Sequence, residues 1–357
     1  MKQMYTLETF LASHEALALN EKSRKEYVAG LIKKAPAGGF LPNSLAHKAD
    51  IKLWEELDVL VIFAIIMGGP FVLFLSGVYC ATLGSWTQCA SWFAMAAFLA
   101  FHPLPKCEQG LAQSKFTLAI YKYFSYRFVW SGDALEANST ERLGSWIGAG
   151  PPHGVLPLAN ILSIPAINTF CFCRFVGAGA SVVSHTPFLR YMTMFGLVDV
   201  GGKSMTKALS KGMCVGVVPD GIAGIFRTNA DDEVVVLKSR KGIARLALRT
   251  GHAIVPAYSI GNTAAFSAFF DGYGLMERVS RKAQAALFPY WGRFGLPIPR
   301  RCNVTMLLGN ALVVEKVEAP TQAQIDELHE RLLSSMAELF DTHKAALGWG
   351  QKKIVFE

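Results

Sequence analysis

The sequence predicts an α/β domain with a largely parallel sheet, preceded by an N-terminal hydrophobic membrane hairpin. From Ser145 onward, short β-rich apolar runs alternate with helical segments, the order that produces parallel sheets. Residues 59–105 form a run of 47 residues without Asp, Glu, Lys or Arg. The whole chain of 357 residues is 52% hydrophobic and only 17% charged, against about 25% charged in ordinary soluble proteins. This composition excludes a disordered chain and argues against a purely cytosolic protein.

The uncharged run is long enough for two membrane passes, because one transmembrane helix needs about 20 apolar residues. We predict passes over residues 59–83 and 86–104, with a turn at Gly84 and Ser85. The triplet 68–70, Gly-Gly-Pro, predicts a kink in the first pass or, alternatively, a re-entrant hairpin. A buried hairpin of a soluble protein is the weaker alternative, since few soluble chains carry an uncharged run of this length.

Basic residues flank this run on both sides and none lies in the turn, so the positive-inside rule places both termini in the cytosol. Residues 1–20 lack the apolar core of a cleavable signal peptide. We therefore expect a cytosolic segment over 1–58, the hairpin over 59–105, and a cytosolic-facing domain over 106–357. The first 58 residues are balanced in charge, so the net charge of +8 belongs to that domain. It suits anionic head groups or an anionic soluble substrate, and no nucleic-acid motif is present.

The elements of the downstream domain follow from local patterns. Residues 111–130 mix aromatic and basic side chains, which is typical of an amphipathic helix on a membrane surface and equally of a helix packed on the core. Helix capping, closing glycines and apolar spacing predict the remaining elements. The predicted strands are 145–150, 196–200, 214–218 and 252–261; the predicted helices are 187–195, 204–209 capped by Ser204, 241–249 closed by Gly251, and one after the Thr321–Gln324 capping box.

His153 is the strongest candidate for a catalytic side chain. It lies in the sequence Gly-Pro-Pro-His-Gly, directly after a predicted strand, where ligands bind in open α/β sheets. Pro152 restricts the backbone before it, and Gly154 permits a tight turn whose amide can face a reacting carbonyl. A neutral imidazole there can act as a general base. A turn histidine without chemistry is the equally simple alternative.

Two further clusters carry charges at element ends. Asp220 and Gly221 follow a predicted strand and form an acidic turn. Arg240, Lys241 and Gly242 open a predicted helix, where free amides beside cationic side chains can bind phosphate groups. A solvated loop and a basic helix face are the plain alternatives. The other histidines show no pairing that indicates a metal site, and neither a Gly-x-Ser-x-Gly nor a Gly-x-Gly-x-x-Gly motif is present.

Several motifs together resemble the type 2 diacylglycerol acyltransferase family, which includes monoacylglycerol and wax-ester acyltransferases. The Pro-Pro-His-Gly of residues 151–154 stands where that family has His-Pro-His-Gly. Residues 239–262 resemble its Arg-Lys-Gly helix and the strand that follows. The resemblance covers roughly the last four-fifths of the chain and includes three C-terminal matches: 292–299, Pro320-Thr321 with Ile325 and His329, and 339–344.

The resemblance implies acyl-CoA-dependent acylation of a lipid alcohol at the endoplasmic reticulum or lipid droplets, with acyl-CoA as substrate and no further cofactor. Diacylglycerol is the expected acceptor, and monoacylglycerol or a long-chain alcohol is the alternative. His153 is implied as general base with Asp220 as the accompanying carboxylate. The turn residues Pro152, Gly154 and Gly221 would shape the oxyanion site, and Arg240, Lys241 and Gly242 would bind acyl-CoA.

The chain departs from the family pattern at two places. Pro151 replaces the first histidine, which keeps a non-catalytic lipid-binding membrane protein as the alternative of another class. Around residues 218–226 the family has Gly-Gly followed by Glu, whereas this chain has Asp220 and then Gly224. Asp220-Gly221 is similar to the Pro-Glu-Gly turn of glycerolipid acyltransferases. Their His-x-x-x-x-Asp motif is not met, because the fifth residue after His153 is Leu158.

Overall fold

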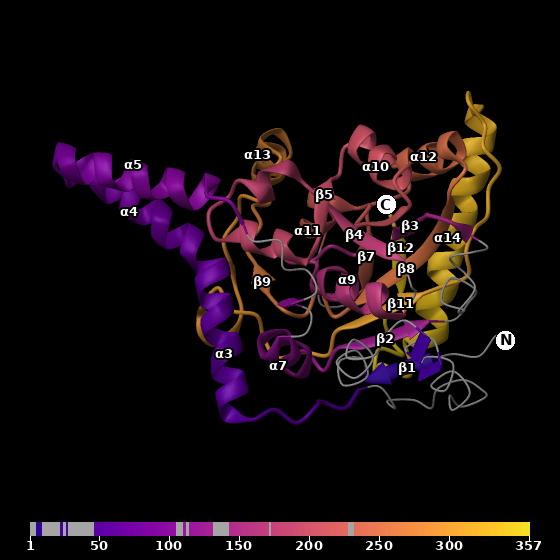
Figure 1. Ribbon diagram of the computed structural model, residues 1–357, viewed down its shortest axis with the longest axis horizontal. Coiled ribbons are helices and arrows are strands. Elements are labelled where there is room, and N and C mark those ends of the chain that lie inside the picture. The colour runs from indigo at the N-terminus through magenta and orange to yellow at the C-terminus, as the bar shows by residue number, and fades with distance from the viewer. Residues whose placement is uncertain are drawn as a thin grey trace.

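An eight-stranded, largely parallel sheet forms the centre of the molecule in the computed structural model, which describes residues 5–8, 22–23, 26–27, 46–104, 110–111, 114–130, 143–170, 173–227 and 232–357. Figure 1 shows the sheet with helices on both faces. In sheet order the strands are β1 (Tyr5–Glu8), β2 (Arg127–Trp130), β11 (Thr305–Leu308), β8 (Ala253–Ile260), β3 (Trp146–Ala149), β6 (Met213–Val217), β4 (Arg174–Gly179) and β5 (Leu197–Asp199). From β8 to β5 all neighbours are parallel, while β11 is antiparallel to β8. The predicted α/β class is confirmed.

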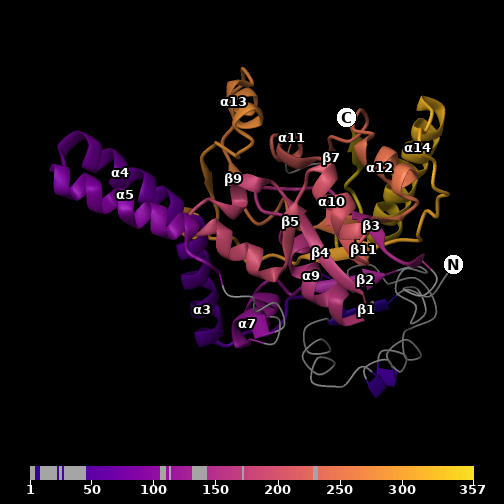
Figure 2. The same cartoon turned by 45° about the horizontal axis from the view of Figure 1, so that its top comes forward.

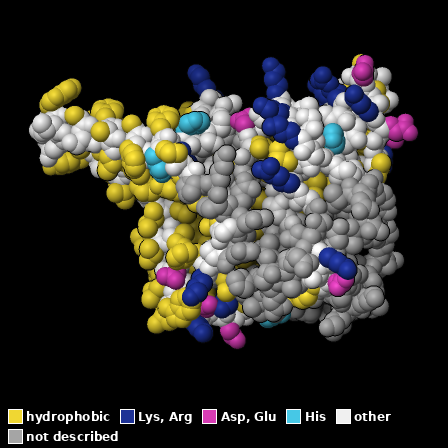
Figure 3. Space-filling view, viewed as in Figure 1, with side chains coloured by type: hydrophobic (Ala, Val, Ile, Leu, Met, Phe, Trp, Pro, Cys, Tyr) yellow, Lys and Arg dark blue, Asp and Glu magenta, His cyan; other side chains and the backbone are white. Residues whose placement is uncertain are grey.

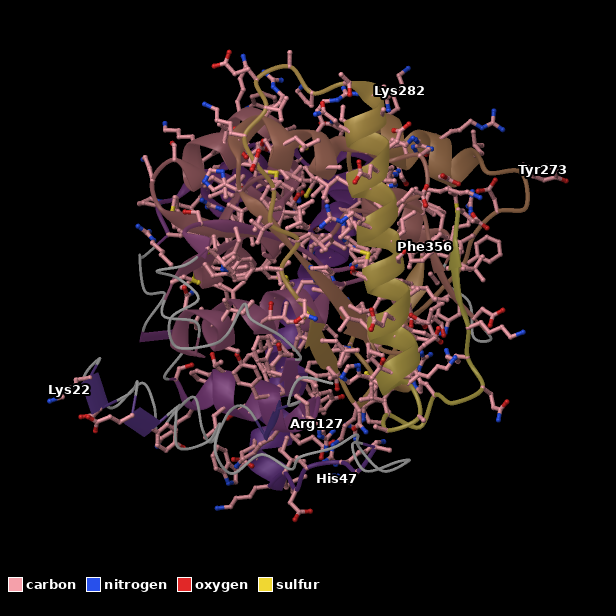
Figure 4. The ribbon with its side chains drawn as sticks, turned by 90° about the vertical axis from the view of Figure 1, so that its right-hand side faces the viewer. Lys22, His47, Arg127, Tyr273, Lys282 and Phe356 are labelled. Carbon is pink, nitrogen blue, oxygen red and sulfur yellow. The ribbon has the colours of Figure 1, made fainter. Side chains whose placement is uncertain are left out.

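One face of the sheet is covered by α10 (Gly202–Leu209), α12 (Gly242–Thr250) and α14 (Gln322–His343). These helices place apolar stripes on the strands, because strands buried on both faces need apolar cover on each side. Figure 4 shows α14 lying across this side of the molecule. The other face carries α9 (Leu158–Phe170) and α7 (Lys115–Tyr123), whose buried residues join the second core cluster.

Small elements complete the edges of the domain. β7 (Glu233–Val235) pairs with β12 (Ile354–Phe356), and β9 (Ser267–Ala268) pairs with β10 (Tyr290–Trp291). The remaining short elements are α11 (Gly221–Ile225), α13 (Leu275–Ala283) and the 3-10 turns η3 (Ser181–Ser184), η4 (Leu189–Phe195) and η5 (Arg293–Gly295). Of these, α11, α13, η3 and η4 contribute residues to the lining of the candidate site.

The predicted strands coincide with β3, β5, β6 and β8 to within a residue or two, and the Thr321 capping box begins α14 as expected. Three helix predictions need correction. The helix expected to be capped by Ser204 begins earlier, with Gly201 as its N-cap. The helix expected over 187–195 is a 3-10 helix over Leu189–Phe195. Within the segment 111–130, the α-helix α7 is packed on the core, while Arg127–Trp130 is strand β2.

A long apolar helical run precedes the domain. It comprises α3 (Leu53–Phe63), the π-helical turn η1 (Ala64–Gly68) and α4 (Gly69–Leu83). Among the described residues, this run, Leu53–Leu83, is the helix that is long and apolar enough to cross a membrane. Its first part packs on the domain: Val59 and Phe63 are buried. Glu55 and Glu56 form ion pairs with Lys122 and Arg293, which fix α3 against the core.

The run continues, through Gly84 and Ser85, into α5 (Trp86–Phe101). We call α4 and α5 the apolar arm, and Figures 1 and 2 show it projecting from the domain with the two helices side by side. Neither helix has a buried residue, and Trp92 donates a hydrogen bond from Nε1 to Ser76 Oγ at 3.0 Å between them. With 16 residues, α5 is about 24 Å long, shorter than the roughly 30 Å hydrocarbon core of a bilayer. The predicted boundaries after residues 58 and 105 stay predictions.

Candidate active site

A cavity of about 1610 Å³ lies against the α9 face of the sheet and reaches its carboxyl edge. Its floor contains three glycines that face one another across neighbouring strands, because Gly148 pairs with Gly216 and Gly216 with Gly177. The rings of Trp146 and Phe175 lie in this region with centroids 5.3 Å apart. A Cβ built on Gly216 would lie 2.4 Å from the Phe175 ring, so the glycines make room for the side chains that line the cavity.

His153 lies on the loop that follows β3 and lines the cavity. Its Nδ1 lies 2.7 Å from the carbonyl oxygen of Gly154. Because a carbonyl only accepts hydrogen bonds, Nδ1 carries the proton and Nε2 keeps its lone pair. Burial lowers the pKa of His153, so the imidazole is neutral at pH 7. The structure thus presents a neutral base with one fixed tautomer inside the cavity.

A set of polar side chains holds this loop in place. Buried Asn262 donates from Nδ2 to the Pro152 carbonyl at 2.8 Å and accepts from the Ala159 amide at 2.8 Å. Asn160 donates to the Gly150 carbonyl at 2.7 Å. Sequence analysis missed these residues. Asn262 follows a buried strand at the end of the 239–262 motif, and that position was the available signal.

Asp220 supports the same loop from behind the cavity. It is fully buried and accepts a hydrogen bond from the His153 backbone N–H at Oδ2, 3.1 Å away. Asp220 is not among the residues that line the cavity, whereas Gly221 is. Burial raises the pKa of Asp220 to about 7, although the bond from His153 and the charge of Arg240 act against this rise. The structure therefore gives Asp220 a contact with the backbone of His153, in contrast to the imidazole contact of a catalytic dyad.

The space beside Asp220 explains why Gly224 is a glycine. A Cβ built on Gly224 would lie 1.9 Å from Asp220 Oδ2 and 2.4 Å from its Cγ. The carboxyl group thus fills the position where a side chain at residue 224 would begin. The two residues at which the chain departs from the family pattern, Asp220 and Gly224, are therefore packed directly against each other.

The residues of the basic cluster 240–242 do not all face the cavity. Arg240 and Gly242 line the cavity, and Arg281 of α13, which sequence analysis did not single out, joins them. Burial and the nearby charge of Arg281 lower the pKa of Arg240. Lys241 instead points to α14 and forms an ion pair with Asp326 at 2.8 Å. Two neighbouring guanidinium groups at one end of a cavity are suited to an anionic ligand.

The predicted site residues therefore meet in one place with the exception of Lys241. His153 and Gly221 line the cavity, Gly154 accepts from the His153 ring, and the Pro152 carbonyl is held by Asn262. Gly154 has φ of +61°, and a Cβ on it would lie 2.5 Å from the Asn262 carbonyl oxygen. Among the described residues, no group of three or more His, Cys, Asp or Glu side chains could hold a metal ion.

Comparison with known proteins places these residues in a family. A family model described as Diacylglycerol acyltransferase matches residues 90–356. Diacylglycerol O-acyltransferase 2 of Rattus norvegicus is 27% identical over 305 residues, which cover 78% of this chain and 78% of the relative. The protein of the same name from Homo sapiens is 26% identical over 258 residues, covering 66% of each chain.

Among solved structures, the crystal structure of the 1-acyl-sn-glycerophosphate (LPA) acyltransferase, PlsC, from Thermotoga maritima is similar at 14% sequence identity. The match covers 75% of this chain and 95% of that chain with a TM-score of 0.36, a value too low to establish a shared fold. The family model, by contrast, spans the site and most of the chain, from α5 to β12. The chain therefore belongs to the diacylglycerol acyltransferase family and is an acyltransferase.

Proposed function

We propose that this protein is a membrane-bound, acyl-CoA-dependent O-acyltransferase that converts diacylglycerol to triacylglycerol at the endoplasmic reticulum or lipid droplets. The observation that carries the proposal is the neutral imidazole of His153, which has a fixed tautomer and lines a large, mostly apolar cavity. The names of the similar relatives support diacylglycerol as the acceptor.

The reaction is a direct acyl transfer. Nε2 of His153 takes the proton from the free hydroxyl of diacylglycerol as the hydroxyl oxygen bonds to the thioester carbon. The carbon–sulfur bond then breaks, the coenzyme A thiolate leaves, and the proton on Nε2 passes to the sulfur. A general base of this kind contributes roughly 10²–10⁴-fold to the rate. Burial lowers the pKa of His153, which keeps the base unprotonated at neutral pH.

The cationic end of the cavity suits the acyl-CoA donor. Arg240 and Arg281 would bind its phosphate groups, and Gly242 would offer a backbone amide at the start of α12. Lys241, which pairs with Asp326, would act by holding the start of α12 in place. In Figure 3, Lys and Arg side chains gather over α10, α12 and α13, so this side of the molecule attracts an anionic carrier.

The apolar arm supports attachment to a membrane. Hydrophobic side chains cover it in Figure 3, and residues at its tip such as Leu83 and Trp86 are 76% and 84% exposed. Because α4 and α5 are 15 and 16 residues long, the arm is better suited to a hairpin inserted from the cytosolic side than to two full passes. Both termini then stay in the cytosol.

Replacement of His153 tests the proposal. The assay uses membranes from cells that lack neutral-lipid synthesis and that express wild-type protein, His153→Ala or the control His252→Ala. His252 directly precedes β8, whereas His153 follows the carboxyl end of the parallel strand β3. We expect wild type and His252→Ala to form triacylglycerol from labelled acyl-CoA, and His153→Ala to lose about 10²–10⁴-fold in rate. Unchanged transfer by His153→Ala at equal expression would disprove its role.

The same assay identifies the acceptor. Monoacylglycerol, diacylglycerol and a long-chain alcohol are offered in parallel to the wild-type protein. Preferred formation of diacylglycerol would identify monoacylglycerol as the acceptor, and preferred formation of a wax ester would identify a long-chain alcohol. Either result would contradict diacylglycerol as the acceptor. Absence of product with every acceptor would instead indicate a lipid-binding membrane protein.

A further inference from the structure

The cavity also reaches the apolar arm. Its wall there is formed by Met67 of η1 and by Pro70, Phe71 and Phe74 of α4. These positions follow one face of the helix, at the i, i+3, i+4 and i+7 spacing. Leu287, Phe288 and Tyr290 line the cavity on the domain side. We call this end the lateral opening.

The lateral opening leads outward to the surface of the arm. Phe74 lines the cavity and yet is 67% exposed, and Phe71 is 40% exposed. The neighbouring Val72 and Leu75 are also exposed, at 68% and 65%, and do not line the cavity. Apolar side chains of α4 therefore face both the cavity and the outside of the arm.

Contacts between the arm and the domain fix the edge of the opening. Tyr290 donates from its hydroxyl to the Met67 carbonyl at 3.0 Å, at the π-helical turn. The rings of Phe71 and Tyr290 lie 5.3 Å apart. Irregular π-helical turns are frequent at functional sites, because they redirect side chains and free a backbone carbonyl. Here the bond from Tyr290 to the Met67 carbonyl ties the root of the arm to the domain.

The charges of the lining determine which reactant each end suits. Among the described residues that line the cavity, those of the types Asp, Glu, Lys and Arg are Asp199, Arg240 and Arg281. None of the three belongs to the lateral opening. An anionic carrier would lose its hydration there without a partner, which is costly. An acyl chain loses nothing and gains buried apolar contact.

We propose that the lateral opening is the site through which the acceptor lipid passes its acyl chains directly from the bilayer into the cavity, while acyl-CoA binds at Arg240 and Arg281. The proposal rests on the proposed function. The two reactants would then meet at His153, and the acceptor would never cross water.

A matched pair of substitutions tests the opening. Phe74→Asp and Leu75→Asp place one charge on adjacent residues of the same helix with nearly equal exposure, but only residue 74 lines the cavity. The full-length proteins are reconstituted in phosphatidylcholine vesicles, and transfer to vesicle-borne long-chain diacylglycerol is measured beside transfer to a short-chain diacylglycerol dispersed in water. Flotation of the vesicles checks that both variants bind equally.

We expect Phe74→Asp to raise the KM for long-chain diacylglycerol about tenfold or more over Leu75→Asp, because a charge opposes passage of acyl chains. The KM values for acyl-CoA and for the short-chain acceptor should stay the same. Equal effects of the two substitutions would overturn the proposal. A rise in the KM for acyl-CoA alone would also overturn it, since the opening would then hold the acyl chain of the donor.

An uncharged pair repeats the test in case the charge disturbs the packing of α4. Phe74→Trp narrows the opening, and Leu75→Trp adds the same bulk outside it. Lower kcat/KM for long-chain than for short-chain acceptor is expected for Phe74→Trp alone; identical profiles would contradict the opening. Failure of the proposed function looks different, because the wild-type protein itself would then make no triacylglycerol.

Discussion

The carboxyl group of Asp220 has two roles, one in packing and one in hydrogen bonding. It lies where a side chain at residue 224 would start, and it holds the backbone N–H of His153. The sequence predicted a carboxylate near His153 but not its contact, because a backbone hydrogen bond across 67 residues leaves no local pattern. Asp220 is thus a positioning residue, and His153 is the candidate catalytic residue.

The raised pKa of Asp220 predicts a pH-dependent stability. Its pKa rises from 3.8 to about 7 on folding, so the folded protein holds this proton more tightly than the unfolded chain. The stabilisation is complete below about pH 4 and is lost as the pH rises through 7. Relative to wild type, Asp220→Asn should therefore gain up to about 3 kcal/mol in the free energy of unfolding between pH 5 and pH 8. Thermal unfolding midpoints at both pH values check this.

Asp326→Asn is the control for that measurement. Hydrogen bonds from Lys241 and Gln322 lower the pKa of Asp326, so its loss should not produce a gain at pH 8. A constant difference between Asp220→Asn and wild type across this pH range would contradict the raised pKa.

The elements of the domain differ in how well local sequence defines them. Buried strands such as β6 and β8 read as continuous apolar runs and were predicted closely. The start of α10 was misplaced because Gly201 caps it, while Ser204 has the more usual capping side chain. The docking of α3 was missed because it depends on Glu55 and Glu56, which precede the uncharged run.

The loop after β3 is held in place by hydrogen bonds from residues elsewhere in the chain. Among them, Asn262 gives the clearest prediction. Asn262→Ala would leave the Pro152 carbonyl and the Ala159 amide without their bonds and lower stability by about 1–3 kcal/mol. It should also lower kcat, because the loop carries His153. Unfolding midpoints and kcat are measured on the same preparations.

Asn168→Ala provides the comparison, since Asn168 of α9 binds the backbone of Phe175 in the same way but lies away from the His153 loop. It should reduce stability similarly and leave kcat near the wild-type value. Equal loss of kcat in both variants would show that general destabilisation, rather than loop position, is responsible.

At the scale of the whole molecule, apolar and basic surfaces are separated. The arm carries the hydrophobic side chains, and Lys and Arg gather over α10, α12 and α13 (Figure 3). Composition alone predicted an apolar segment and a basic domain, because both are long in sequence. The cavity that joins them was beyond sequence reasoning, since its lining comes from elements far apart in the chain, among them α4, α9, α13 and the strands β3, β4 and β6.

Membrane binding should depend on the tip of the arm. Leu83→Asp with Trp86→Asp places charges at the outermost exposed residues of α4 and α5. A charge at the centre of a membrane costs about 2.5–3.5 kcal/mol, so vesicle flotation should lose most of the bound protein. The control is Val313→Asp with Tyr273→Asp, on the domain surface, where Tyr273 points into solvent (Figure 4). Equal binding of both double variants would contradict insertion of the arm.

The hydrogen bond between His153 Nδ1 and the Gly154 carbonyl has a kinetic consequence. A neutral peptide group, unlike a carboxylate, gives little electrostatic support to a positively charged ring. The imidazolium would therefore be short-lived, and arrival of the proton on nitrogen and its departure to sulfur would follow each other closely. Removal of the proton from the hydroxyl and its delivery to the sulfur would then be nearly simultaneous, and the departure of the thiolate would set when they occur.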